Sequence, residues 1–160
     1  MSRLTAAHRV REHLISHGVG YEIHEHPEVY TAQELAAAEH VPGRRVAKPV
    51  ILAADDSLVM AVLAAPDHIS LTKARQALGC DEVRIAGELE FGSVFSDCEL
   101  GAEPPFGSLY GMPTYVDERL LSAEEILFSG GDHTHSIRIS TADFLDMSDA
   151  IRVDVAAGII

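Results

Sequence analysis

The sequence predicts an α+β fold with a mixed or largely antiparallel sheet. Two pairs of apolar, strand-like segments are each interrupted by a short polar turn, which is typical of β-hairpins. The first pair, 45–54 and 58–65, flanks Asp55-Asp56-Ser57, and the second, 124–129 and 133–140, flanks a Gly-Gly-Asp turn. Helical segments are interspersed without regular βαβ alternation, and this arrangement favours an α+β fold over a doubly wound one.

The N-terminal half begins with a predicted helix over 3–17, where apolar residues recur at helical spacing before a glycine. Residues 21–26 alternate in polarity and predict a short strand. Thr31 and Glu34 form a capping-box pattern that begins a second helix, which Pro42-Gly43 ends. The first hairpin follows this helix.

The C-terminal half continues with a predicted helix over 70–78 and a short strand over 82–86. The stretch 97–113, DCELGAEPPFGSLYGMP, carries three glycines and three prolines, and it therefore predicts a long, stiff loop. A strand over 114–117 and the second hairpin come next. A last helix over 142–147 is predicted to be capped by the Ser-Thr pair before it.

The chain is 160 residues long and has a mass of 17.3 kDa. A single domain over residues 1–160 is the simplest expectation, and it buries about 70% of its unfolded surface. No apolar run reaches the ~20 residues that span a bilayer, and the first residues are too charged for a signal peptide. Two cysteines, Cys80 and Cys98, do not make a disulfide framework. We therefore expect a cytoplasmic protein with no membrane partner.

The formal net charge of −13 argues against a general nucleic-acid binder, and DNA is not an expected partner. The charge is uneven, because residues 1–84 are nearly balanced while residues 85–160 hold 3 Lys/Arg against 14 Asp/Glu. Any phosphate contact is therefore expected from the first half, at Arg44, Arg45, Lys73 and Arg75.

The common catalytic motifs are absent from the sequence: no phosphate-binding loop, dinucleotide fingerprint, serine nucleophile elbow, zinc-protease helix or EF-hand loop occurs. Lys48 is the first candidate, because it alternates with apolar residues on one side of a predicted strand and is one of only two lysines. Burial of its ammonium would tune it for chemistry. The alternative is a lysine that protects an edge strand, which the adjoining Pro49 also suggests.

Other candidates have equally plain structural alternatives. His24-x-His26 and His133-x-His135 each place two imidazoles on one face of a predicted strand, where they could bind zinc or simply be hydrogen-bonded. Cys98 could be a nucleophile or a small buried apolar residue. Tyr30 could belong to the core or reach a pocket with its hydroxyl.

Two glycine-rich segments, GAEPP (101–105) and SGGD (129–132), could present bare backbone to a ligand, since glycine permits close approach. Backbone amides suit a developing oxyanion, and carbonyls can orient a water molecule. Lys48 together with two such loops would make a hydrolytic site poor in side chains. Two tight turns without further function are the alternative.

Taken in order, these segments resemble the YbaK/prolyl-tRNA-synthetase-associated domain family. The resemblance covers nearly the whole chain, and its most specific parts are the lysine and the GxxxP loop from Gly101 to Pro105. The matching segments are EHPEVYTAQELAAAEHV (25–41), VAK (46–48), CELGAEPPFG (98–107), YGMPTYVDERL (110–120) and FSGGDHTHSIRISTADFL (128–145).

Members of that family are aminoacyl-tRNA deacylases that act in trans, or editing domains inserted in prolyl-tRNA synthetase. The resemblance implies a curved, barrel-like mixed sheet flanked by helices, no metal and no organic cofactor. It implies catalytic roles for Lys48, which lines the pocket, and for Gly101, whose loop borders the reacting carbonyl. The remaining pocket residues would be Tyr30, Pro105, Phe106, Ser129, Gly130, Gly131 and His133.

The expected function is hydrolysis of the ester of a mischarged aminoacyl-tRNA that carries a small amino acid. Its partners would be the tRNA acceptor end and an aminoacyl-tRNA synthetase. The family usually has a small polar residue after the lysine, where this chain has Pro49, which lacks both a polar side chain and a backbone N–H. This departure leaves open a non-catalytic module that binds tRNA ends or a synthetase, and the histidines leave open a metalloprotein.

Overall fold

A computed structural model describes residues 5–99 and 101–157, which form an α+β fold. The helices are α1 (Ala6–Ser16), α2 (Ala32–Ala38), α3 (Leu71–Leu78), α4 (Glu88–Phe91) and α5 (Thr141–Ser148). The strands are β1 (Glu22–Glu25), β2 (Ala47–Ala54), β3 (Ser57–Ala64), β4 (Val83–Ile85), β5 (Thr114–Asp117), β6 (Glu125–Ser129), β7 (His135–Ser140) and β8 (Ile151–Val153).

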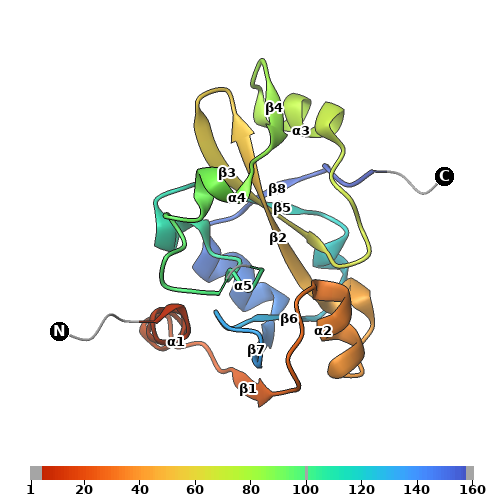
Figure 1. The fold of residues 1–160 in the computed structure, drawn as a ribbon. Coiled ribbons are helices and arrows are strands. Elements are labelled where there is room, and N and C mark those ends of the chain that lie inside the picture. The colour runs from red at the N-terminus through yellow and green to blue at the C-terminus, as the bar shows by residue number, and fades with distance from the viewer. Residues whose placement is uncertain (1–4, 100, 158–160) are drawn as a thin grey trace.

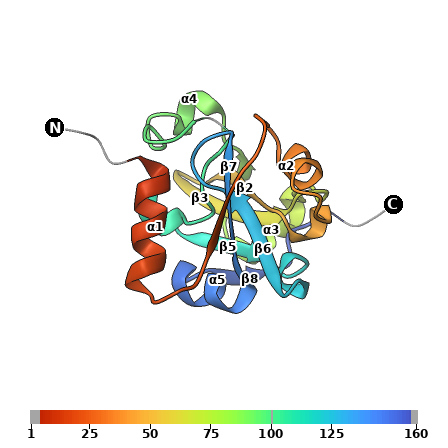
Figure 2. The same cartoon turned by 90° about the horizontal axis from the view of Figure 1, so that it is seen from below.

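The strands form two sheets that lie across one another (Figures 1 and 2). One is antiparallel, in the order β1-β7-β6. The other is mixed, in the order β4-β2-β3-β5-β8, with β5 and β8 parallel to their neighbours. An isolated parallel bridge between Val46 and Leu127 joins the two sheets. The α+β class and the mixed sheet are confirmed.

The main core lies between the two sheets and beneath α1 and α5. Apolar residues recur at the spacing that places them on the inner faces of these helices and strands. Members of the core include Met60 from the five-stranded sheet, Phe128 from the three-stranded sheet and Val10 from α1. The opposite face of β3 packs against α3 and the C-terminal segment, through residues such as Leu63 and Val155. Because both faces of β3 are covered, its sequence is almost continuously apolar rather than alternating.

Local sequence signals account for most element boundaries. Thr5, Thr31, Ser70 and Ser140 each cap a helix by accepting the N–H three residues later. Gly79 adopts the left-handed conformation that ends α3. The first hairpin turns through Asp55-Asp56, and Ala54 pairs with Ser57.

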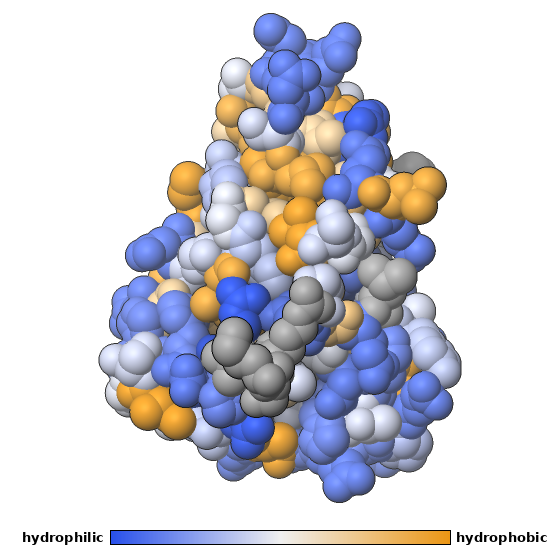
Figure 3. All heavy atoms as spheres, turned by 60° about the vertical axis from the view of Figure 1, so that its left-hand side comes forward, coloured by the Kyte–Doolittle hydropathy of each residue, from blue (hydrophilic) through white to orange (hydrophobic). Residues whose placement is uncertain are grey.

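Among the α-helices and strands given above, two have no counterpart among the sequence predictions. These are α4 and β8, which have only four and three residues and so carry no readable periodicity. Among the described helices, none has the length and apolar character needed to cross a membrane. On the face shown in Figure 3, hydrophobic residues gather just below a hydrophilic upper tip, while hydrophilic residues dominate the lower half.

Candidate functional site

The glycine- and proline-rich loop is tied to α1 at both of its ends. The Asp97 carboxylate accepts hydrogen bonds from the Tyr110 hydroxyl at 3.0 Å and from the Arg9 guanidinium at 2.6 Å. Arg9 also donates to the Leu109 carbonyl and lies over the Tyr110 ring, 4.9 Å from its centroid. These contacts close the loop and fix it against a helix, so its middle is held as a rigid wall.

Burial fixes the middle of the loop as well. Phe106 is fully buried in the main core, where its ring packs against Phe128 at 5.3 Å and Phe144 at 5.7 Å between centroids. Pro105 is also buried. The Phe106 side chain therefore anchors the loop from within the core, rather than facing the cluster described next.

Three residues that are distant in sequence meet beside this loop. The rings of Tyr30 and His133 are 4.8 Å apart between centroids. A Cβ added to Gly101 would lie 3.1 Å from the Tyr30 carbonyl oxygen and 3.5 Å from His133 Cε1. The φ of Gly101 is +88°, a conformation that side-chain-bearing residues rarely adopt. We refer to Tyr30, Gly101 and His133 as the Tyr–Gly–His cluster.

The Gly101 N–H is not open to a ligand in this structure, because it donates to Glu103 Oε1 at 3.1 Å. The loop thus presents a carboxylate held by its own backbone. Burial raises the pKa of the Glu103 carboxyl, while the Gly101 N–H and the nearby His133 lower it in part. Glu103 was not among the residues expected at the site, and its place within GxxxP was the available signal.

The charge around the Tyr–Gly–His cluster is mostly negative. His133 Nε2 lies 3.3 Å from a carboxylate oxygen of Glu99. Glu28, with smaller contributions from Glu99 and Glu34, raises the pKa of the Tyr30 phenol, because a neighbouring carboxylate disfavours the phenolate.

The SGGD turn is positioned by α1 and by its own aspartate. Gly131 has a φ of +105°, and a Cβ there would lie 2.7 Å from the Ala6 Cβ, so only glycine allows the turn to approach α1 this closely. Asp132 Oδ1 accepts the N–H groups of Thr134 at 2.9 Å and His135 at 2.8 Å. Gly130 donates to the His135 carbonyl at 3.0 Å, which closes the turn.

The position of His133 corrects one expectation. We expected His133 and His135 to share one face of a strand, but β7 begins only at His135. His133 belongs to the turn and joins the Tyr–Gly–His cluster, whereas His135 Nδ1 lies 3.0 Å from Asp132 Oδ2. His133 lies outside the strand because the Asp132 carboxylate accepts the N–H groups of Thr134 and His135, which keeps the chain in a turn. Ser129 ends β6, where it pairs with Ser136.

Lys48 lies on β2 and makes its hydrogen bonds to the segment after β3. Its ammonium donates to the Ala65 carbonyl at 3.2 Å and to the Asp67 carbonyl. Burial lowers its pKa from 10.5, and the charge of Asp67 opposes this shift. An ammonium has three protons, and two of them are used here. Neither of these bonds goes to the Tyr–Gly–His cluster.

Pro49 lies at an edge of the sheet. The Ile51 carbonyl accepts the Ala86 N–H on the β4 side at 2.9 Å, and Pro49, two residues earlier, faces the same side. Only residues 52–54 of β2 pair with β4. The missing N–H of Pro49 therefore costs no hydrogen bond within the sheet.

The four basic residues expected to contact phosphate do not form one surface. Arg44 and Arg45 lie in the turn before β2 and share a hollow of about 400 Å³ with residues 122–125. Lys73 and Arg75 lie on α3, beside β4 at the other end of β2 (Figure 1). Lys73 is engaged, since its ammonium is 3.0 Å from the Asp154 carboxylate and 2.9 Å from the Ala156 carbonyl.

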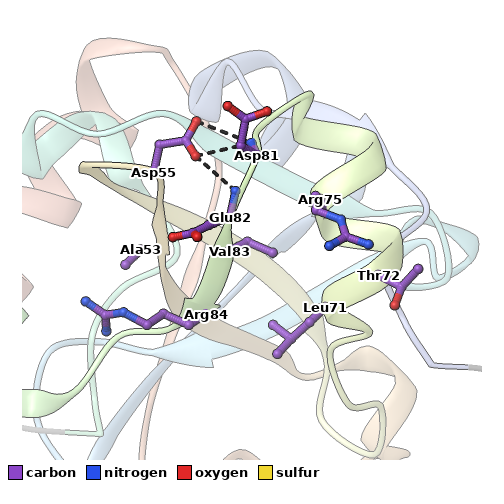
Figure 4. Close-up of a pocket in the computed structure, with 9 residues that line it drawn as sticks. All are labelled: Ala53, Asp55, Leu71, Thr72, Arg75, Asp81, Glu82, Val83 and Arg84. Atoms are coloured by element: carbon purple, nitrogen blue, oxygen red, sulfur yellow. Dashed lines mark hydrogen bonds between the residues drawn. The ribbon is translucent and has the colours of Figure 1, made fainter.

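Arg75 lines a separate hollow of about 350 Å³ between α3, the hairpin turn and β4 (Figure 4). Its wall is fixed by Asp55, whose carboxylate accepts the backbone N–H groups of Asp81 at 3.2 Å and Glu82 at 3.0 Å. The negative charges of Asp55, Asp81 and Glu82, which line the same hollow, offset the positive charge of Arg75. This hollow therefore offers a mixed surface rather than a phosphate cradle.

Among the described residues, His24 and His26 each make polar contacts through at least one ring nitrogen, but the buried His26 Nε2 has no hydrogen-bond partner. His24 lies between the carboxylates of Glu22 and Glu39, and His26 Nδ1 lies 2.8 Å from the Pro27 carbonyl oxygen. Over residues 5–99 and 101–157, no three His, Cys, Asp or Glu side chains gather in an arrangement that could hold a metal ion.

Cys98 is half-buried, and its thiol donates to the Phe95 carbonyl at 3.5 Å. Burial, followed by the charges of Glu103 and Asp97, raises its pKa to about 12. At neutral pH it is therefore a thiol and a poor nucleophile.

In a Cys80→Ser variant, we expect Cys98 to react with iodoacetamide at pH 8 at least about tenfold more slowly than free cysteine. Mass spectrometry measures the rate, and labelling as fast as free cysteine would contradict this assignment.

Comparison with known proteins assigns the chain to a family. The model of the aminoacyl-tRNA editing domain matches residues 26–147. Two proline–tRNA ligases from strains of Acidithiobacillus ferrooxidans are each 32% identical over 95 residues, which is 59% of this chain and 16% of the ligase. The chain thus spans only a small part of the length of these relatives.

Among the solved structures that share the fold, two are informative. A protein proposed to be a trans-editing enzyme for prolyl-tRNA synthetase superimposes with a TM-score of 0.84 at 25% identity, over 98% of this chain and all of that one. A Marinobacter aquaeolei protein proposed to act in signal transduction superimposes with a TM-score of 0.74 at 21% identity, over 98% of this chain and 31% of that one. The latter shows the fold alone. With the family model matched over most of its length, the chain belongs to the aminoacyl-tRNA editing domain family.

Proposed function

We propose that this protein hydrolyses the ester bond of a mischarged aminoacyl-tRNA that carries a small amino acid. The observation that carries the proposal is the Tyr–Gly–His cluster, in which residues 30, 101 and 133 converge at one wall of a rigid loop. The family membership and the similarity to a protein proposed to edit in trans support the same function.

An aminoacyl ester is already activated, so placing a water molecule and stabilising the developing oxyanion can suffice for hydrolysis. In this proposal Gly101 lets the loop backbone approach the ester, and His133, positioned by Glu99, orients the attacking water. The SGGD turn borders the amino-acid side chain. Its packing against α1 limits the space available, which favours small side chains.

Lys48 acts in this proposal through the proton of its ammonium that is not bonded to Ala65 or Asp67. That proton is directed to an oxygen of the substrate. Arg44 and Arg45, which lie together in one turn, contact the phosphates of the acceptor end. An aminoacyl-tRNA synthetase is the proposed protein partner, since the relatives at 32% identity are themselves proline–tRNA ligases.

The direct test is release of amino acid from tRNAs charged with Ala, Ser, Thr, Cys or Pro. We expect measurable release of the amino acid from at least one tRNA charged with a small amino acid. An acid-gel or radiolabel assay monitors this release. No release from any of the five would refute the proposal. Binding of charged tRNA without release would instead support the non-catalytic module.

The Lys48→Met variant is expected to lower the deacylation rate at least about 100-fold, as for loss of one preorganised donor. Lys73→Met is the matched control, because Lys73 also donates to a backbone carbonyl but lies on α3. It should keep wild-type activity. Thermal unfolding of both variants separates lost chemistry from lost folding, and equal activity of the two variants would remove Lys48 from the site.

A further inference from the structure

Glu103 is fixed more firmly than a surface carboxylate would be. It stands between Ala102, which is 1% exposed, and the buried run of residues 104–107. The Ala102 N–H donates to the Glu99 carbonyl at 3.0 Å, which closes a turn directly before Glu103. Its own carboxylate is held by the Gly101 N–H at 3.1 Å. The position of this carboxylate is thus set by the backbone rather than by a flexible side chain alone.

His133 lies close enough to Glu103 to lower the pKa of its carboxyl, but His133 Nε2 is also 3.3 Å from a carboxylate oxygen of Glu99. Glu88 adds further negative charge. A half-buried carboxylate is stabilised strongly by a hydrogen-bonded cation, because water screens such a pair less than it does at the surface. The chemistry of this position therefore fits a cationic donor.

An aminoacyl ester supplies such a donor. Its α-ammonium is attached to the carbon next to the ester carbonyl, so a site that borders the carbonyl lies within reach of the ammonium. The Gly101 backbone and the Glu103 carboxylate are hydrogen-bonded to each other. One short loop can therefore contact both the ester carbonyl and the α-ammonium group of the same substrate.

We propose that the Glu103 carboxylate forms a subsite for the α-ammonium group of the aminoacyl ester. This inference rests on the proposed function and extends it to the substrate class. The site selects esters with a free amine and rejects N-acylated ones, such as peptidyl- or formyl-aminoacyl-tRNA. Acylation removes the charge and places an uncharged group against a half-buried carboxylate.

Glu103→Gln removes the negative charge but keeps an oxygen that can accept the Gly101 N–H. The loop should therefore remain folded, which thermal unfolding can verify. Glu88→Gln is the matched control, since it removes the same charge from α4 nearby.

The test compares two stable probes, alanine joined by an amide bond to 3′-amino-3′-deoxyadenosine and the N-acetyl form of the same compound. We expect the wild-type protein to bind the free amine at least about tenfold more tightly in calorimetry. The preference should fall to about twofold or less in Glu103→Gln and persist in Glu88→Gln. Deacylation of Ala-tRNA and N-acetyl-Ala-tRNA should show the same pattern in kcat/KM.

The outcomes separate this inference from the proposed function. A Glu103-dependent preference in binding without any deacylation would support the subsite and refute the enzyme. Deacylation without a preference for the free amine, or with a preference that survives in Glu103→Gln, would overturn the subsite. The subsite would also be overturned if Glu103→Gln lowered kcat/KM equally for Ala-tRNA and N-acetyl-Ala-tRNA, because the preference for the free amine would then be unchanged.

Discussion

Replacing Gly101 with alanine is expected to reduce deacylation at least about 100-fold. The φ of +88° makes any side chain strained, at about 1–2 kcal/mol. The larger effect is steric, because the new Cβ would press on the Tyr30 carbonyl at 3.1 Å and approach His133 at 3.5 Å. The loop or the Tyr30 backbone must then move by a few tenths of an ångström, which displaces the surface that we propose borders the ester.

Gly111→Ala provides the matched control for this substitution. Gly111 lies in the same loop with a φ of +72°, but a Cβ there would meet no atom within 4 Å. The control should therefore lose a similar free energy of unfolding, about 1–2 kcal/mol, and keep its activity. Denaturant unfolding and single-turnover deacylation measure the two effects. Similar rates for both variants would show that Gly101 matters only through backbone strain.

Replacing Asp117 with alanine is expected to lower the free energy of unfolding by about 3–5 kcal/mol, because buried donors would be left without an acceptor. Asp117 is fully buried, and its carboxylate accepts the N–H groups of Val155 at 2.8 Å, Ala156 at 3.0 Å and Arg119 at 3.0 Å. These bonds hold the C-terminal segment against β5. Urea unfolding followed by circular dichroism measures the loss.

Asp154→Ala is the corresponding control, since it removes a carboxylate from the same C-terminal segment. Among the described residues, the Asp154 carboxylate pairs with the Lys73 ammonium at 3.0 Å, and the Asp154 side chain is 56% exposed. Exposed pairs of this kind contribute about 0–1 kcal/mol, so the expected loss is within that range. If Asp117→Ala cost no more than Asp154→Ala, the buried carboxylate would not be the anchor of this segment.

The sequence predicted the parts of the fold that depend on near neighbours. The Asp55-Asp56 turn between two apolar strands marked the first hairpin, and the Thr31 and Ser140 caps marked the starts of α2 and α5. These predictions succeeded because a cap or a tight turn is decided by hydrogen bonds within a few residues. The α+β class followed from the same local signals.

The features that the sequence did not predict concern contacts between distant segments. β8 is short and pairs in parallel with β5, so its pairing partner rather than its own sequence makes it a strand. The division into two sheets depends on a core that residues of both sheets share with residues of α1 and α5. Phe106 reads as a pocket residue in sequence, but the fold places its ring in the core.

For the candidate site, the sequence by itself determined the ingredients: a lysine on a strand, a stiff GxxxP loop and a glycine-rich turn. Only the tertiary structure decided that Tyr30, Gly101 and His133 meet, that Lys48 binds the carbonyls of Ala65 and Asp67, and that Glu103 occupies the Gly101 N–H. The physical reason is that these contacts join segments brought together by burial of a shared core, or depend on a loop conformation that this burial imposes.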